Sequence, residues 1–352
     1  MDGPVPVSGH PHEAPLPPVD LAPYRGADTV RSVWQLATSF LLFALTWVLM
    51  YLLLPVSVVL TLLLSVPAAF FLVRLFIIQH DCGHGSFFRS ARTANVVGGI
   101  LGVLTLTPYS YWKKTHAMHH AGSGNLEHRG FGDIETKTVE EYERLSWFGR
   151  LRYRVYRHPL VLFGIGPAVH FIVRHRLPII VPRSWKRERR SILLNDLGLA
   201  AFVVTMGLTV GWGRFLVVQL PIALLSCSIG VWLFYVQHQF EYTYWEHDER
   251  WEYAAAAMHG SSYLRLPKLL QWATGNIGIH HVHHLNPRIP NYRLPRVLAE
   301  HPELRQFSPV TLWQSVKCMR LTLWDEAERR LIAFSRLREL RRERAAAMAT
   351  GS

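Results

Sequence analysis

Three short histidine-rich segments are the parts of this sequence best suited to chemistry. They read HDCGH at 80–84, HAMHH at 116–120 and HHVHH at 280–284, and they hold nine of the nineteen histidines. In a helix, positions three or four apart share a face, so HxxxH presents two imidazoles and each HxxHH presents three. The pattern therefore predicts eight convergent nitrogen donors, from His80, His84, His116, His119, His120, His280, His283 and His284.

The number of imidazoles helps to choose the metal. Neutral imidazole binds zinc, copper, iron and nickel, so residue type alone leaves the metal open. One zinc ion takes four ligands, and a catalytic zinc takes only three from the protein. Eight or nine histidines exceed that need by about twofold. Two six-coordinate ions with positions left open for oxygen would use them, which favours a pair of irons.

Further residues near the clusters are candidates for the same site. His238 follows the last long apolar run and is a ninth candidate ligand. Asp81, Glu241 and Asn276 lie beside a candidate ligand or one helical turn from it, where they would orient imidazoles or cap helices. Isolated histidines, such as those at 158, 170, 175, 247 and 301, are interpreted as ordinary polar residues.

Long apolar runs must position these clusters. The chain is 49% hydrophobic and 18% charged, and its apolar residues are concentrated in a few runs. We expect an all-α integral membrane protein with four transmembrane helices in two hairpins, spanning about 33–54, 56–78, 192–212 and 215–236. Shorter apolar stretches at 94–108 and 159–173 predict interfacial or re-entrant helices, and the histidines form a cytoplasmic cap.

Charge sets the expected orientation and domains. The net charge is +13, with arginines crowded beside the apolar runs, so the positive-inside rule places both termini and all three clusters in the cytoplasm. No nucleic-acid-binding module accompanies this charge, and the three cysteines show no CxxC spacing. We expect a disordered proline-rich leader at 1–30, a membrane domain at 31–310 and a basic amphipathic helix and tail at 311–352.

Four motifs resemble the histidine boxes and flanking sequence of membrane fatty acid desaturases. They are HDCGHGSFF at 80–88, HAMHH at 116–120, GNLEHRGFGD at 124–133 and HHVHHLNPRIPNY at 280–292. The resemblance covers about residues 30–300 and is closest to the delta-12 or omega-6 acyl-lipid type. It implies that two irons are held by His80, His84, His116, His119, His120, His238, His280, His283 and His284. His281 occupies a variable position of the third box and is left out.

The resemblance also implies a reaction and its partners. Two irons would use O2 as co-substrate to introduce a C=C bond into a fatty acyl chain carried by a lipid, coenzyme A or acyl carrier protein. The HPGG motif of fused cytochrome b5 domains is absent, so a separate ferredoxin or cytochrome b5 would supply electrons. Zinc can replace iron at imidazole sites in overexpressed protein.

Two other functions fit the same residues. A related di-iron membrane hydroxylase, ketolase or acetylenase would act on a lipid or hydrocarbon through the same chemistry, and the spacing of the histidines does not separate it from a desaturase. A non-oxidative membrane zinc-binding protein belongs to a different class. It would need its polar clusters inside the membrane or along a path across it, whereas here they gather on one predicted face.

Overall fold

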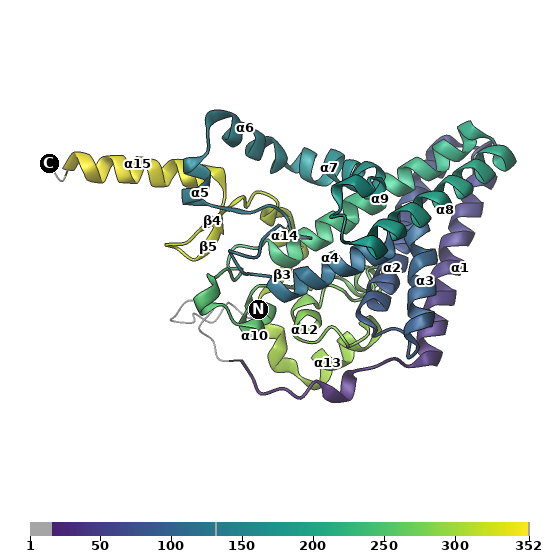
Figure 1. The fold of residues 1–352 in the computed structure, drawn as a ribbon, viewed down its shortest axis with the longest axis horizontal. Helices are drawn as coiled ribbons and strands as arrows, with labels where there is room; N and C mark the ends of the chain where they lie inside the picture. The colour runs from purple at the N-terminus through teal and green to yellow at the C-terminus, as the bar shows by residue number, and fades with distance from the viewer. Residues whose placement is uncertain (1–15, 131, 351–352) are drawn as a thin grey trace.

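Four long apolar helices dominate the architecture. The computed structural model describes residues 16–130 and 132–350. Within this part of the chain, four helices are long and apolar enough to cross a membrane, and they form two hairpins (Figure 1): α1 (Thr29–Leu53) with α2 (Val58–His84), and α8 (Lys186–Val210) with α9 (Trp212–His238). The prediction of a helical membrane fold with four spans is therefore confirmed.

The ends of the first hairpin follow from local sequence. The Asp28 carboxylate caps α1 by accepting a hydrogen bond from the backbone of Arg31, and the Ser57 hydroxyl caps α2 in the same way. Gly85 closes α2 with φ of 67°, a left-handed conformation that glycine adopts without steric cost. The helix ends six residues beyond the predicted end at 78. The prediction ended it where the apolar run ends, but the polar residues 79–84 that follow remain helical.

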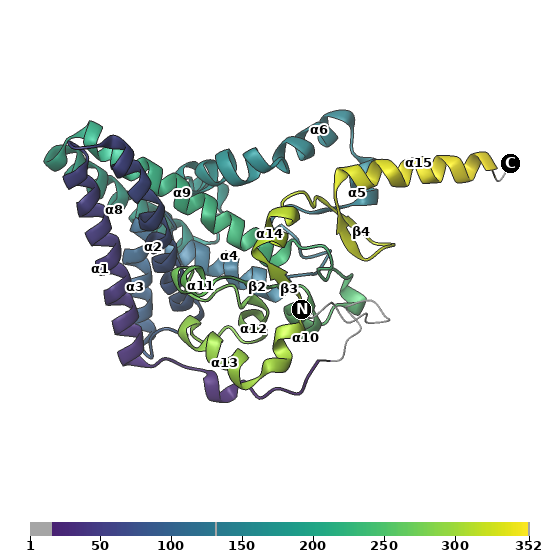
Figure 2. The ribbon, with the colours of Figure 1, turned by 180° about the vertical axis from the view of Figure 1, so that it is seen from behind.

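Two shorter helices pack beside the hairpins. Helix α2 packs against α1, α9 and α3 (Ala91–Leu104), the last of which corresponds to the short apolar stretch expected at 94–108. Helix α4 (Tyr109–Gly122) packs against α8. Both hairpin turns lie at one end of the molecule, and the histidine-bearing ends of α2 and α9 reach into its middle (Figures 1 and 2).

The remaining segments build a cap around the ends of α2, α4 and α9. Its helices are α5 (Val139–Arg144), α6 (Trp147–Tyr156), α7 (Gly166–Ala168), α10 (Tyr253–His259), α11 (Lys268–Ala273), α12 (His280–Leu285), α13 (Leu294–Glu300), α14 (Leu312–Cys318) and α15 (Phe334–Thr350). Two π-helical segments, Val161–Ile165 and Val169–Val173, flank α7 and occupy the second short apolar stretch.

Two small open sheets fasten the cap. In the first, β4 (Leu323–Asp325) lies between β1 (Lys137–Thr138), which is parallel to it, and β5 (Arg330–Ile332), which is antiparallel. In the second, β2 (Tyr263–Arg265) pairs in parallel with β3 (Pro309–Thr311). In the two parallel pairs the partners are far apart in sequence, so these strands tie the C-terminal part of the chain to the segments that follow α4 and precede α12.

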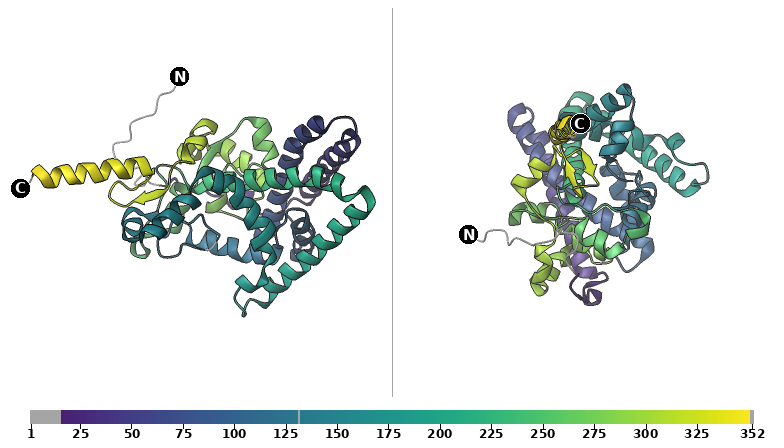
Figure 3. Two further views of the ribbon diagram at one scale, coloured as in Figure 1. Left: turned by 90° about the horizontal axis from the view of Figure 1, so that it is seen from above. Right: turned by 90° about the vertical axis from the view of Figure 1, so that its left-hand side faces the viewer.

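The two ends of the chain differ in how they pack. Residues 1–15 of the expected leader lie outside the described residues, but Leu21 and Tyr24 are buried against the cap near α13. At the other end, α14, β4 and β5 precede α15, so the basic helix begins at Phe334 and projects away from the body of the molecule (Figure 3). The division into leader, membrane domain and tail stays a prediction.

Candidate metal centre

Four helices carry the predicted ligands to one place. They come from the C-terminal turns of α2 and α9, from α4 and from α12. The structure brings all nine together in two groups, and within each group one nitrogen from every member lies within 4.8 Å of the others. The five-histidine group consists of His80, His84, His116, His120 and His283, and the four-histidine group of His119, His238, His280 and His284.

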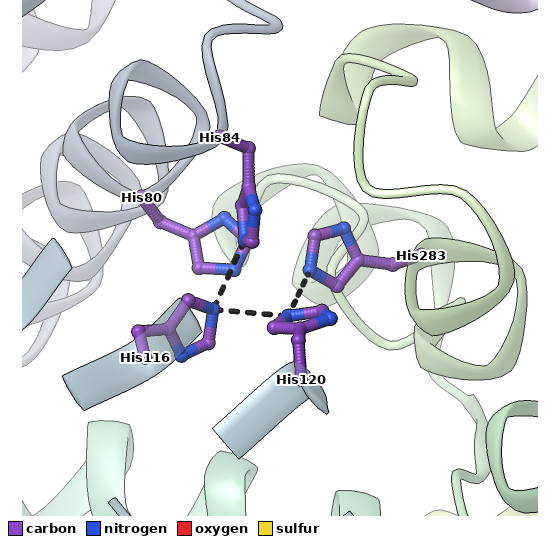
Figure 4. A group of neighbouring side chains, drawn as sticks. All are labelled: His80, His84, His116, His120 and His283. Atoms are coloured by element: carbon purple, nitrogen blue, oxygen red, sulfur yellow. Dashed lines mark hydrogen bonds between the residues drawn. The ribbon is translucent and has the colours of Figure 1, made fainter. Parts of the chain in front are cut away.

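The five-histidine group has the spacing expected around one ion (Figure 4). The Nε2 atom of His116 lies 3.0 Å from that of His84 and 3.1 Å from that of His120, whose Nε2 lies 3.2 Å from that of His283. Metal–imidazole bonds are about 2.1 Å long, so two of them at right angles place their nitrogens about 3.0 Å apart. These distances therefore suit ligands that share an ion.

Hydrogen bonding alone does not explain these short contacts. A neutral imidazole Nε2 carries either one proton or one lone pair, yet the Nε2 atom of His116 faces two others, and so does that of His120. The Nε2 atoms of His80 and His284 are buried without a hydrogen-bond partner in the described part of the chain. Since buried polar atoms are normally satisfied, the donor set fits metal ions.

The four-histidine group is arranged in the same way. The Nε2 atom of His238 lies 3.1 Å from that of His119 and 3.0 Å from that of His280. Its Nδ1 lies 3.2 Å from the carbonyl oxygen of Gly260, to which it can donate. The His284 ring stacks on His120 of the other group, with centroids 4.0 Å apart, so the two groups are in direct contact. His238 thus lies within the four-histidine group, and its role as a ninth ligand stays a prediction.

Burial keeps the ligands outside the spans neutral. It lowers the pKa of His116, His120, His283 and His284 well below the usual value of 6.5, and the neighbouring imidazoles lower it further. A neutral imidazole has a free lone pair for a cation, whereas a protonated one has none. The cap is therefore suited to hold metal at neutral pH.

Asp81 contacts a candidate ligand of the five-histidine group. One carboxylate oxygen lies 3.0 Å from Nδ1 of His80, which leaves Nε2 directed at the other imidazoles. The other oxygen accepts hydrogen bonds of 2.7 and 2.8 Å from the backbone and side chain of Asn291. The Gln35 side chain donates to Asn291 in turn. This network links α1, α2 and the segment after the third box.

Asp133 plays the equivalent part in the four-histidine group, and the analysis of the sequence did not single it out. Its carboxylate lies 2.5 Å from Nδ1 of His119. The residue stands in the GNLEHRGFGD stretch, fourteen positions after its partner, so helical spacing gives no sign of the contact. Its only sign in the sequence is that it lies within a stretch that resembles desaturase sequences.

The other two candidate orienting residues lie elsewhere. Glu241 is exposed, and its carboxylate accepts a hydrogen bond from Arg330 rather than from an imidazole. Asn276 has a positive φ of 58° in the turn before the third box and donates to the backbone of Asn291. Neither is hydrogen-bonded to a candidate ligand among the described residues, so the prediction that they orient imidazoles directly lacks support.

His281 points away from both groups. It is fully buried, and its Nε2 donates to the carbonyl oxygen of Leu304 at 3.0 Å. This placement agrees with its omission from the predicted ligands. Within α12, the imidazoles at positions 280, 283 and 284 therefore face the centre while the one at 281 packs into the cap.

An indole shields the five-histidine group on the side of α4. The Trp112 ring stacks on His116 with centroids 4.4 Å apart and also lies 5.6 Å from His80. A Cβ atom at Gly83 would lie 2.9 Å from this ring. The glycine inside the first box is thus explained by the close approach of the indole, which helps to exclude water from the ligands.

Comparisons with known proteins agree with this geometry. The family model described as Fatty acid desaturase matches residues 55–315. A fatty acid desaturase of Bacillus subtilis is 46% identical over 320 residues, which cover 91% of this chain and 90% of the relative. An sn-1 acyl-lipid omega-3 desaturase (ferredoxin) of Synechocystis is 29% identical and covers 68% of each chain, and a chloroplastic omega-6 desaturase of Brassica napus is 25% identical over 62% of this chain and 48% of its own. The chain therefore belongs to the fatty acid desaturase family and is a desaturase enzyme.

Proposed function

We propose that this enzyme introduces a C=C bond into a fatty acyl chain in an O2-dependent reaction at two histidine-bound irons. The observation that supports this most strongly is the convergence of nine buried imidazoles into two adjoining groups. Two irons bound there would activate O2 and remove hydrogen from an unactivated methylene. In the balanced reaction, a CH2–CH2 unit, O2, two electrons and two protons give CH=CH and two waters.

The chain's own residues would hold and shield this centre. Asp81 and Asp133 fix the ring orientation of His80 and His119 by accepting from Nδ1, which leaves Nε2 free to bind metal. Trp112 covers one side of the five-histidine group. Excluding water from such a site protects the reaction from competing chemistry.

The acyl substrate is proposed to be lipid-linked, with the double bond placed at the delta-12 or omega-6 position. The relatives support an acyl chain on a membrane lipid, because three of them are named as acyl-lipid desaturases. Several are named as omega-3 enzymes and one as an omega-6 enzyme, so the position within the acyl chain is left to the experiment. Coenzyme A and acyl carrier protein are the alternative carriers.

A separate one-electron carrier, ferredoxin or cytochrome b5, is proposed as the reductant. The Synechocystis enzyme and an Arabidopsis relative are named as ferredoxin-dependent desaturases. The net charge of +13 suits an acidic carrier protein. We further propose that the termini and the cap face the cytoplasm, since arginines are concentrated in the segments beside the histidine-bearing ends of the helices.

Expression in a bacterial host without polyunsaturated lipids, followed by mass spectrometry of its fatty acids, tests the proposal. A desaturase removes two hydrogens, and the position of the new bond gives its selectivity. The His283→Ala variant is the control, since it lacks one proposed ligand. A product that gained oxygen would identify a hydroxylase instead. Purified protein with a single zinc and no iron after growth in iron-rich medium would contradict the di-iron centre.

A further inference from the structure

Arg157 is a fully buried cation close to the metal centre, with 1% of its surface exposed. Its guanidinium donates only to neutral acceptors. They are the carbonyl oxygens of Glu135 (3.0 Å) and Leu321 (2.8 Å), the hydroxyls of Thr136 (3.4 Å) and Tyr235 (3.1 Å), and Oε1 of Gln239 (2.9 Å). No carboxylate of the described residues forms an ion pair with it. Since burying an unpaired charge costs several kcal/mol, a purely space-filling role does not account for this arginine.

The acceptors of Arg157 belong to the two segments that serve the four-histidine group. Gln239 directly follows His238, a candidate ligand at the end of α9. Glu135 and Thr136 closely follow Asp133, the carboxylate that contacts His119.

The two segments are also joined directly, because the Thr136 hydroxyl donates to Oε1 of Gln239 at 3.1 Å. The Arg157 side chain thus links the segment that contacts His119 to the segment that carries His238, and so helps to set the distance between them.

We propose that Arg157 is a positioning residue for the four-histidine group, acting through Thr136 and Gln239. This inference rests on the proposed metal-binding role of the histidines. The nitrogens of His119 and His238 lie 3.1 Å apart, and that spacing depends on how the loop at 133–136 sits against the end of α9. Contacts of Arg157 do not extend to Asp81, which orients the five-histidine group through His80. The effect of losing Arg157 should therefore fall on one ion.

The geometry requires arginine rather than lysine at this position. The two terminal nitrogens of the planar guanidinium donate to acceptors in the loop at 135–136, in α9 and in the segment before β4. Lysine carries its three donors on a single nitrogen, so it cannot donate to the loop at 135–136 and to the end of α9 at the distances that the two guanidinium nitrogens span. Arg157→Lys would keep the positive charge while losing part of the link between the loop and α9.

The test compares two buried threonines changed to valine. Thr136→Val removes the hydroxyl between Arg157 and Gln239, whereas Thr322→Val removes an equally buried hydroxyl that donates to Ile332 in the neighbouring sheet. Both variants keep side-chain volume. Iron binding to the purified full-length proteins would be titrated against a competing chelator. The His238→Ala variant identifies which of the two binding steps belongs to the four-histidine group.

We expect Thr136→Val and Arg157→Lys to weaken one of the two iron-binding steps by about tenfold or more, as loss of outer partners of metal ligands does. The other step and both steps in Thr322→Val should match the wild type. Unchanged binding in Thr136→Val and Arg157→Lys would overturn the inference. So would equal weakening of both steps together with a lower melting temperature, since that describes a general structural role. Wild-type protein that binds no pair of irons would instead contradict the proposed function.

Discussion

Replacing Asp133 by asparagine should selectively weaken the ion held by the four-histidine group. The carboxylate lies 2.5 Å from Nδ1 of His119, and its side chain is only 12% exposed, so water screens the contact little. Loss of such a partner typically lowers metal affinity by about 10–100-fold. That range corresponds to about 1.4–2.8 kcal/mol at tenfold per 1.4 kcal/mol. Asparagine keeps an acceptor oxygen without the charge, so we expect the lower end, and the upper end for Asp133→Ala.

The assay is the amount of iron retained per chain as a competing chelator is raised, measured beside desaturase activity. Asp248→Asn is the matched control, because Asp248 faces His128 at 3.4 Å on the surface and 57% of its side chain is exposed. The control should retain both irons and full activity. If Asp133→Ala held both irons with wild-type affinity, the contact with His119 would not orient a ligand and the reasoning would fail.

Four further predictions follow from the same structure. His283→Ala should abolish desaturation while the protein still inserts into membranes. His281→Gln keeps a donor for the carbonyl oxygen of Leu304 and should retain activity. Equal loss of activity in both variants at equal expression would refute the assignment of ligands in the third box. Strong chelation should remove activity and added ferrous iron should restore it better than zinc, as activity measurements after metal removal would reveal. Gly83→Ala should lower the free energy of unfolding by about 1–3 kcal/mol in chemical denaturation, because its Cβ would press on the neighbouring indole; no change would show that the ring relaxes freely. Cysteines introduced at Gly213 and Glu249 should react with impermeant reagents from opposite sides of the membrane, and the three native cysteines, all buried, should give little background; labelling from one side would contradict the proposed topology.

The sequence was sufficient to predict the spans and eight of the nine clustered histidines, because both depend on local patterns. Runs of hydrocarbon specify a membrane helix wherever they occur, and HxxHH places three imidazoles on one helical face. His238 was predictable from its position at the end of the last span. These features need no knowledge of which distant segments pack together.

The partners of the ligands depend on long-range packing and were harder to predict. Glu241 stands only three residues after His238, but the helix has ended, and its carboxylate instead meets Arg330. Asp133 reaches His119 from a loop outside any helical repeat. In the sequence, Arg157 is one of several arginines beside the apolar runs, and no local pattern sets it apart. It is buried because segments far apart in the sequence surround it and supply its acceptors.

The assembly of each histidine group from segments far apart in the chain has a consequence for biogenesis. Within the five-histidine group, about 200 residues separate His80, on the first hairpin, from His283 in the third box. At about 5–20 residues per second, a ribosome takes about 10–40 seconds to synthesise that interval. During this time the first hairpin can already be inserted, while its imidazoles lack their partners from α12. Complete histidine groups, and with them the proposed metal pair, can therefore form only late in the maturation of the nascent enzyme, after the third box has left the ribosome.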